Sequence, residues 1–342
     1  MRGFMKIVKR VLIVLGVVLV LLGVWVTISS YPVNMVVRAL FHGGVAVPPD
    51  NYEEIVEQVE IKRNINYHSQ YKNGIMDIIS PKTQNEDLPV IIWVHGGGFV
   101  GGDKSDVEEY AVQIASEGYV VVNINYALAP ETKYPTPILQ LGEVYEFLLE
   151  NKEEYRIDMN NLFLAGDSAG AHIVGQFSMI QTDASYAELV GIQPVMDSTG
   201  IEAVLLFCGP FDLMRSMEVA ENNAVLKFFV RQILWGYTGT KDGKTQKELT
   251  EISLIDYVSE DFPPSFVTDG NTYTFTQQGK DFSEKLEMLG VEVVAIFYDT
   301  EEKLLHEYQF MMDNKYSYHT YESVIQFLER HSKGIEFDDK AE

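Results

Sequence analysis

Short apolar runs alternate with amphipathic stretches along most of the chain. The runs have the length of buried strands and occur at residues 59–67, 75–80 and 88–94, and around Val120, Leu162, Val204, Phe266 and Val293. Helical spacing of apolar residues lies between them, at residues 106–117, 136–150, 169–180, 276–289 and 321–330. This alternation predicts an α/β fold, with a mostly parallel eight-stranded sheet and helices on both faces. The first two strands, joined through Asn73 and Gly74, are expected to form a hairpin.

Two stretches do not fit this alternation, residues 33–57 and residues 213–262. The second contains Phe228, Phe229 and Trp235 in runs spaced like an amphipathic helix. Most apolar stripes of this kind belong to a core, but above an active site they would line a substrate pocket. We predict that both stretches form a cap on one large domain, residues 31–335, which is followed by an acidic tail, residues 336–342.

The first 30 residues follow another pattern. An uncharged apolar run, residues 11–28, is long enough to cross a bilayer as a helix, and four cations precede it, Arg2, Lys6, Lys9 and Arg10. This charge distribution orients the N-terminus towards the cytoplasm. A cleaved signal peptide looks similar, but its apolar region is shorter, and residues 27–31 offer only a weak cleavage pattern. We therefore predict an uncleaved signal anchor, residues 1–30, that crosses the cell membrane once and leaves the domain outside the cytoplasm.

The sequence Gly166-Asp167-Ser168-Ala169-Gly170 has the pattern of a nucleophile elbow. It follows a predicted strand and begins a predicted helix, which is the context such a turn requires. We expect a strained backbone at Ser168, with glycines on either side because side chains there would collide with the neighbouring strand or helix. A chance match in a glycine-containing loop is the alternative, and the flanking strand and helix favour the nucleophile.

A glycine-rich segment, His95 to Phe99, directly follows the predicted third strand. Acyl transfer by a serine creates negative charge on the carbonyl oxygen, and backbone N–H groups aimed at that oxygen stabilise it. We predict an oxyanion hole formed by the N–H groups of Gly97 and Gly98 and by that of Ala169, the residue after the nucleophile. A flexible glycine turn is the alternative for this segment.

These motifs resemble those of the hormone-sensitive-lipase-like branch of the α/β-hydrolases, a group of esterases and lipases. The resemblance extends from about residue 71 to residue 330 and includes the glycine segment, residues 125–131, the serine motif and His306. It departs at Ala127, where the family usually carries an arginine. The resemblance implies an α/β-hydrolase fold, a structural role for His95, and a catalytic triad in the chain order serine, acid, histidine.

His306 is the histidine that suits this order. It follows the predicted eighth strand and an acidic loop, and the segment His306 to Phe310 resembles the family's His-Gly-Phe block, with Glu307 in place of the glycine. His172 lies one turn into the helix after Ser168, so its side chain should point away from the exposed face of the serine. We predict that His306 is the general base.

The acid of the triad departs from the family pattern. Counting past the predicted seventh strand places the family's aspartate at Tyr273, which cannot replace a buried carboxylate. Asp269, at the tip of that strand, is the nearest carboxylate and is our prediction. Asp212, after the sixth strand, is the alternative, and it could equally cap a helix or turn. An incomplete triad is the third possibility.

Composition adds limits on partners. The chain of 342 residues has a formal net charge of −24, and without the four N-terminal cations the remainder has 22 basic and 50 acidic residues, a net charge of −28. Such a charge repels nucleic acid and favours neutral or cationic esters, although solubility alone also explains it. The only cysteine, Cys208, lies in an apolar run and is expected in the core. Zinc-ligand spacing and phosphate-binding glycine loops are absent from the sequence, so neither a metal nor a nucleotide cofactor is implied.

Together these features predict a membrane-anchored serine hydrolase that cleaves small, neutral carboxylic esters through an acyl-enzyme. Cleavage of amides or peptides is compatible with the same triad. A binding protein on a degenerate hydrolase fold is the alternative that Tyr273 suggests.

Overall fold

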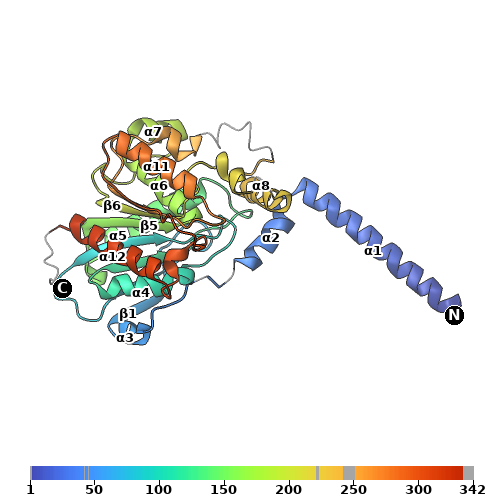
Figure 1. The fold of residues 1–342 in the computed structure, drawn as a ribbon, viewed down its shortest axis with the longest axis horizontal. Coiled ribbons are helices and arrows are strands. Elements are labelled where there is room, and N and C mark those ends of the chain that lie inside the picture. Colours follow the sequence, from blue (N-terminus) through green and yellow to red (C-terminus); the bar gives the residue numbers. More distant parts are fainter. Residues whose placement is uncertain (1, 42, 45, 221–222, 242–250, 334–342) are drawn as a thin grey trace.

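The protein is described from a computed structural model that covers residues 2–41, 43–44, 46–220, 223–241 and 251–333 (Figure 1). The predicted acidic tail, residues 336–342, lies outside the described residues. A single sheet organises the body of the molecule, and the N-terminal helix extends away from it (Figure 1).

Within the described residues the sheet has eight strands in the order β1-β2-β4-β3-β5-β6-β7-β8. The β1–β2 and β2–β4 pairs are antiparallel and the remaining pairs are parallel, so the predicted opening hairpin and mostly parallel sheet are confirmed. The strands are β1 (Val59–Asn66), β2 (Ile75–Pro81), β3 (Leu88–Val94), β4 (Val120–Ile124), β5 (Ile157–Asp167), β6 (Ala203–Phe207), β7 (Ser265–Thr268) and β8 (Val293–Ile296).

Helices connect and cover these strands. The longer ones are α1 (Arg2–Ile28), α2 (Tyr31–Leu40), α4 (Glu108–Ser116), α5 (Thr136–Tyr155), α6 (Ala169–Thr182), α8 (Ala224–Thr238), α11 (Thr276–Met288) and α12 (Lys315–His331). Shorter helices and 3-10 turns are α3 (Tyr52–Val56), α7 (Ala184–Val190), α10 (Leu254–Tyr257), η1 (Lys104–Val107), η2 (Arg215–Ala220) and η4 (Tyr308–Phe310).

The central strands are buried on both faces, which explains their unbroken apolar runs. Along β3, Val90 and Ile92 point into one core with side chains of α5, α6 and α11. Ile91 and Trp93 point into a second core with side chains of α4 and α12. Helices therefore cover both faces of the sheet, as the alternating pattern predicts.

Local signals moved some predicted boundaries. Helix α12 begins at Lys315, earlier than expected, because the Asn314 side chain accepts hydrogen bonds from the first backbone N–H groups of the helix. The helix predicted at residues 106–117 is preceded by the 3-10 turn η1, which Asp103 and Asp106 close with a capping box. Helix periodicity alone does not report such caps.

The two predicted cap stretches separate into different parts of the molecule. In the first, α2 packs against α8, whereas α3 packs against α4 and β1. In the second, α8 lies beside α2, and α10 packs against α6 and α11. Helices α2 and α8 are therefore the part of these stretches that lies together beside the junction with α1 (Figure 1).

Candidate active site

Ser168 lies at the turn between β5 and α6, with a backbone φ of 51° and ψ of −118°. A side chain at this φ is strained, and the surrounding backbone holds it in place. A Cβ atom at Gly166 would lie 2.5 Å from the backbone of Gly170, and one at Gly170 would overlap the carbonyl oxygen of Val94 in β3. The small residues that the motif requires are thus explained by the close approach of strand and helix. The Ser168 N–H donates to the Phe207 carbonyl over 2.8 Å.

Ser168 and His306 are hydrogen-bonded although 138 residues separate them. The Oγ atom of Ser168 lies 2.9 Å from Nε2 of His306. On the other side of the ring, Nδ1 lies 2.8 Å from the Oγ1 atom of Thr274, and that hydroxyl donates to Oδ1 of Asp269. Since the Thr274 proton points to the carboxylate, its oxygen is left to accept from Nδ1–H, which leaves Nε2 free to accept the Ser168 proton.

The charges at the site follow from burial. The Asp269 side chain is 2% exposed, and this burial raises its pKa to about 6, while hydrogen bonds from Thr274 and Gly270 act in the opposite direction. Burial also lowers the pKa of His306 to about 4, so its ring is neutral at neutral pH. A neutral imidazole beside an ionised carboxylate is the starting state of a general base.

Gly97 and Gly98 lie in the same pocket as Ser168, and so does Ala169. Gly97 has a φ of 100° and Gly98 a φ of 60°, and a Cβ atom at Gly97 would overlap the backbone of Gly101. Glycine is therefore required for the segment to bring its backbone close to the serine. His95 is buried behind this loop, where its Nδ1 lies 2.7 Å from the Gly96 carbonyl oxygen and its ring stacks on Tyr126.

A pair of carboxyl groups, those of Asp167 and Glu307, lies beside the serine. Asp167 is 3% exposed and accepts hydrogen bonds from the Trp93 indole at 2.9 Å and the Gly96 N–H at 2.7 Å. It also bonds to the carboxyl group of Glu307, and burial together with the Asp167 charge raises the pKa of Glu307 well above its usual value. The Glu307 carboxyl oxygen lies 3.8 Å from Nε2 of His306. A protonated Glu307 therefore donates to ionised Asp167 next to the reacting groups.

The alternative acid, Asp212, and the family position, Tyr273, make other contacts. Asp212 accepts hydrogen bonds from the N–H groups of Met214 and Arg215 and from the Ser253 hydroxyl, so it caps the turn that leads into η2. Tyr273 is 80% exposed, has a φ of 54°, and lines the pocket. Asp269 is the carboxylate that the fold connects to His306.

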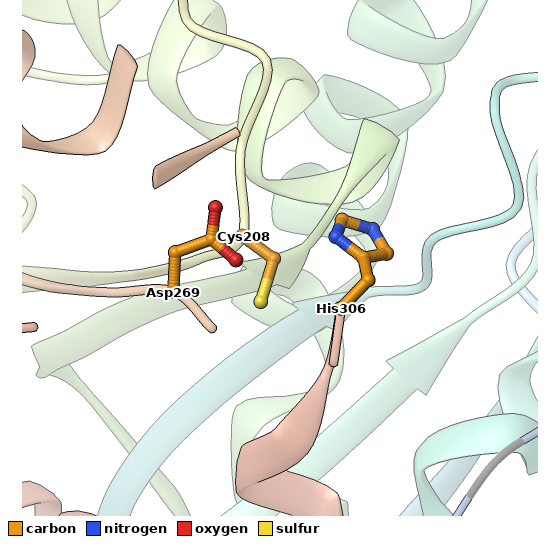
Figure 2. A group of neighbouring side chains, drawn as sticks. All are labelled: Cys208, Asp269 and His306. Atoms are coloured by element: carbon orange, nitrogen blue, oxygen red, sulfur yellow. The ribbon is translucent and has the colours of Figure 1, made fainter. Parts of the chain in front are cut away.

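Cys208 is buried in the core, as expected, and Figure 2 shows it beside Asp269 and His306. Potential ligand atoms of Cys208, Asp269 and His306 lie within 4.8 Å of one another. Burial raises the pKa of the thiol well above its usual value, and metal binding requires a thiolate. Because the histidine already faces Ser168 and Thr274, we interpret the cluster as the buried surroundings of His306 rather than as a metal centre.

A pocket of about 780 Å³ contains Ser168 and His306 in its wall. This volume is in the range of small-molecule sites, and the lining is mostly apolar. One side of it is formed by α2 with the residue that follows it and by α8, through Leu40, Phe41, Leu226, Phe229, Val230 and Ile233.

Three contributors to the site were not singled out from the sequence. Thr274 and Asp167 carry no signal of their own, since each is defined by contacts between distant segments. Glu307 did carry one, because it takes the place of a family glycine. Its φ of 62° shows why glycine suits that position and makes a glutamate there unusual.

Comparison with known proteins identifies the family. The chain is similar to esterase LipC of Mycobacterium tuberculosis, with 28% identity over 203 residues that cover 58% of this chain and 48% of LipC. It is 26% identical to an esterase of Gibberella moniliformis over 223 residues, covering 62% of this chain and 65% of that protein. The chain thus spans about half to two thirds of the length of these curated relatives.

A sequence model of the BD-FAE family matches residues 76–286, and the chain belongs to this family. Its fold is shared by esterase B from Lactobacillus rhamnosis, with a TM-score of 0.70, 19% identity, and coverage of 88% of this chain and 90% of that one. The predicted α/β-hydrolase fold and the resemblance to hormone-sensitive-lipase-like esterases are confirmed. Relatives and structural neighbours named as esterases are consistent with an enzyme of the hydrolase class.

Proposed function

We propose that the protein is a serine carboxylesterase that cleaves neutral acyl esters through an acyl-enzyme at Ser168. The observation that carries this proposal is the continuous hydrogen-bonded path from the Ser168 hydroxyl through His306 and Thr274 to Asp269. Esterase relatives support the same reaction class. The mostly apolar pocket favours uncharged acyl and alcohol groups.

In the acylation step, Oγ of Ser168 attacks the ester carbonyl carbon while its proton passes to Nε2 of His306. The C–O bond to the alcohol then breaks, and Nε2 returns the proton to the leaving oxygen. Asp269, acting through the Thr274 hydroxyl, stabilises the imidazolium that forms between these two transfers. Thr274 is a positioning residue in this mechanism, because it acts through His306.

Backbone N–H groups of Gly97, Gly98 and Ala169 stabilise the negative charge on the carbonyl oxygen in the tetrahedral intermediate. The N–H group of Ser168 already donates to the Phe207 carbonyl and is not available to the substrate. The N–H group of Ala169, the next residue, therefore donates to the carbonyl oxygen of the ester. Water then attacks the carbonyl carbon of the acyl-enzyme and gives a proton to Nε2 of His306. The bond between that carbon and Oγ of Ser168 breaks, Nε2 returns the proton to Oγ, and the carboxylic acid leaves with the serine restored.

Hydrolysis of a series of p-nitrophenyl esters by the detergent-solubilised full chain tests this proposal. We expect turnover by the unaltered protein and a loss of about 10⁴-fold or more in kcat for Ser168→Ala, as for other serine triads. Ser178→Ala is a matched control, since that serine lies in α6, the helix that begins after Ser168, and is not in the pocket. Equal turnover by Ser168→Ala and the unaltered protein would contradict the proposal.

We further propose that α1 is an uncleaved membrane anchor with the hydrolase domain outside the cytoplasm. Within the span Gly3–Ile28, an 18-residue window has a mean hydropathy of 3.1 and none of it is buried, which supports a membrane-crossing helix by length and composition. A cleaved signal sequence would have the same features. The mass of the protein recovered from membranes shows whether residues 1–30 are still present, and their loss would contradict an uncleaved anchor. Protease treatment of intact cells should degrade the domain; protection from protease would contradict the orientation.

A further inference from the structure

Helices α2 and α8 together form a platform beside the active-site pocket. They pack so closely that a Cβ atom at Gly236 of α8 would overlap the side chain of Asn34 in α2. Arg38 of α2 fixes this pair to the body by donating to the carbonyl oxygens of Val100 at 2.5 Å and Ala129 at 2.7 Å and by pairing with Glu131. The orientation of the platform relative to the pocket is therefore set by the fold.

Large apolar side chains are exposed on the outer surface of this platform. Val36 and Leu40 of α2 are 53% and 73% exposed, and Val225 and Phe228 of α8 are 66% and 40% exposed. Leu40 and Val225 also line the pocket, so they mark its mouth. Exposed apolar side chains gathered around a pocket mouth are typical of a surface that meets another apolar phase.

The charge of α8 differs from that of the whole chain. The helix carries Lys227 and Arg231 and has neither aspartate nor glutamate, whereas the chain has 50 acidic residues against 26 basic ones. An amphipathic helix with cations beside Phe, Leu and Trp side chains suits the surface of an anionic bilayer. The acidic body would be repelled from the same surface, so α8 is favoured to face it.

The platform also lies at the end of the apolar helix α1. Only Ser29 and Ser30 separate α1 from α2, and Lys241, just after α8, donates to the carbonyl oxygen of Thr27 near the end of α1. Figure 1 shows α2 and α8 on the side of the body where α1 leaves it. A bilayer crossed by α1 would therefore adjoin the platform and the pocket mouth.

We propose that the outer face of α2 and α8 lies on the bilayer and that the pocket takes its substrate, an ester with a long acyl chain, from within the membrane. This inference rests on the proposed esterase function and membrane anchor. In this arrangement the acyl chain passes the mouth at Leu40 and Val225 without crossing water, and its carbonyl carbon reaches Ser168 at the inner end of the pocket.

Fluorescence quenching tests the location of the face. Phe228→Cys and Met288→Cys variants of the full chain are labelled with bimane and reconstituted in vesicles of phosphatidylcholine and phosphatidylglycerol containing doxyl lipids. Met288 is a matched control because it is 84% exposed on α11 and outside the pocket, and the native Cys208 is fully buried. We expect strong quenching at position 228 and little at 288. Equal quenching at the two positions would overturn the proposed contact.

Ester hydrolysis by the protein reconstituted in such vesicles tests whether the substrate is delivered from the membrane. A Val36→Glu, Phe228→Glu double variant changes exposed positions outside the pocket lining, and Met288→Glu is its control. Turnover of a long-chain diacylglycerol in the bilayer should fall about tenfold in the double variant, because apolar contact with lipid is lost, while turnover of soluble p-nitrophenyl acetate stays the same. Unchanged diacylglycerol turnover would overturn the inference.

Failure of the unaltered protein to hydrolyse either ester would instead contradict the esterase function. The quenching experiment would still show whether the face contacts the bilayer.

Discussion

The hydroxyl of Thr274 lies between His306 and its carboxylate, 2.8 Å from Nδ1 of the imidazole and hydrogen-bonded to Asp269. In the usual triad a carboxylate holds the imidazole directly. In the proposed mechanism a neutral hydroxyl transmits the orientation, and the negative charge of Asp269 acts from one group further away. Asp269 stands at the tip of β7 rather than at position 273, and we infer that the Thr274 hydroxyl connects it to His306 for this reason.

Removing the Thr274 hydroxyl should therefore impair the base. Thr274→Val keeps the shape of the side chain, and we expect kcat to fall by about 10² to 10³-fold, within the range known for lost general-base support. Thr274→Ser should retain most of the activity because it keeps the hydroxyl. The measurement is steady-state kinetics with p-nitrophenyl butyrate, and equal rates for the valine and serine variants would contradict a role for the hydroxyl.

The pH dependence of kcat/KM should report Asp269. The carboxylate must be ionised to support the imidazolium, and its pKa is raised to about 6 by burial, whereas the pKa of His306 is lowered to about 4. Activity should thus decline as the pH falls through about 6. Asp269→Asn should lower the activity by about 10³ to 10⁴-fold, and its activity should no longer decline with a midpoint near pH 6. If the decline keeps the same midpoint in that variant, a group other than Asp269 causes it, which would contradict the prediction.

The pairing of Glu307 with Asp167 makes a separate prediction about stability. Several acidic or titratable groups face Glu307: Asp167, Asp106, Asp269, His306 and Cys208. Because the folded-state pKa of Glu307 lies above its unfolded value, folding takes up a proton, and the stability from this group is lost as pH rises through the folded pKa.

Glu307→Gln keeps a neutral donor to Asp167 at every pH. We expect this variant to gain stability relative to the unaltered protein, on the order of 1 kcal/mol at pH 8, with a smaller gain near pH 5. Urea unfolding of the solubilised protein at the two pH values measures the difference. Glu292→Gln, at a side chain 48% exposed, controls for loss of a surface charge. A gain that is larger at pH 5 would contradict a shared proton in the carboxyl pair.

The sequence predicted the sheet, the covering helices and the positions of Ser168, His306 and the glycine loop, because each depends on local pattern and chain order. The bridge through Thr274 could not be predicted in this way, since the path of the loop after β7 depends on packing against the segment around Leu304 and Leu305. The choice between Asp269 and Asp212 could not be predicted for the same reason, because it depends on which strand end lies nearest His306. The family pattern pointed to position 273, and only the backbone conformation there shows its side chain turned outward.

The close contact at the serine turn should make Gly170 intolerant of substitution. A Cβ atom there would overlap the backbone of β3, so Gly170→Ala should destabilise the protein by about 3 kcal/mol or more. Gly142→Ala is a suitable control, because the added Cβ atom would have neighbours no closer than 3.6 Å in helix α5. Thermal unfolding followed by circular dichroism compares the two, and similar midpoints would contradict the packing described at the elbow.

Trapping the acyl-enzyme tests the central claim most directly. Intact-protein mass spectrometry after rapid acid quenching of a reaction with p-nitrophenyl butyrate should show one added butyryl group, and digestion should place it on Ser168. The adduct should accumulate in His306→Ala preparations only slowly and be absent from Ser168→Ala. A butyryl group on another residue, or hydrolysis by the unaltered protein that persists in Ser168→Ala, would contradict the account.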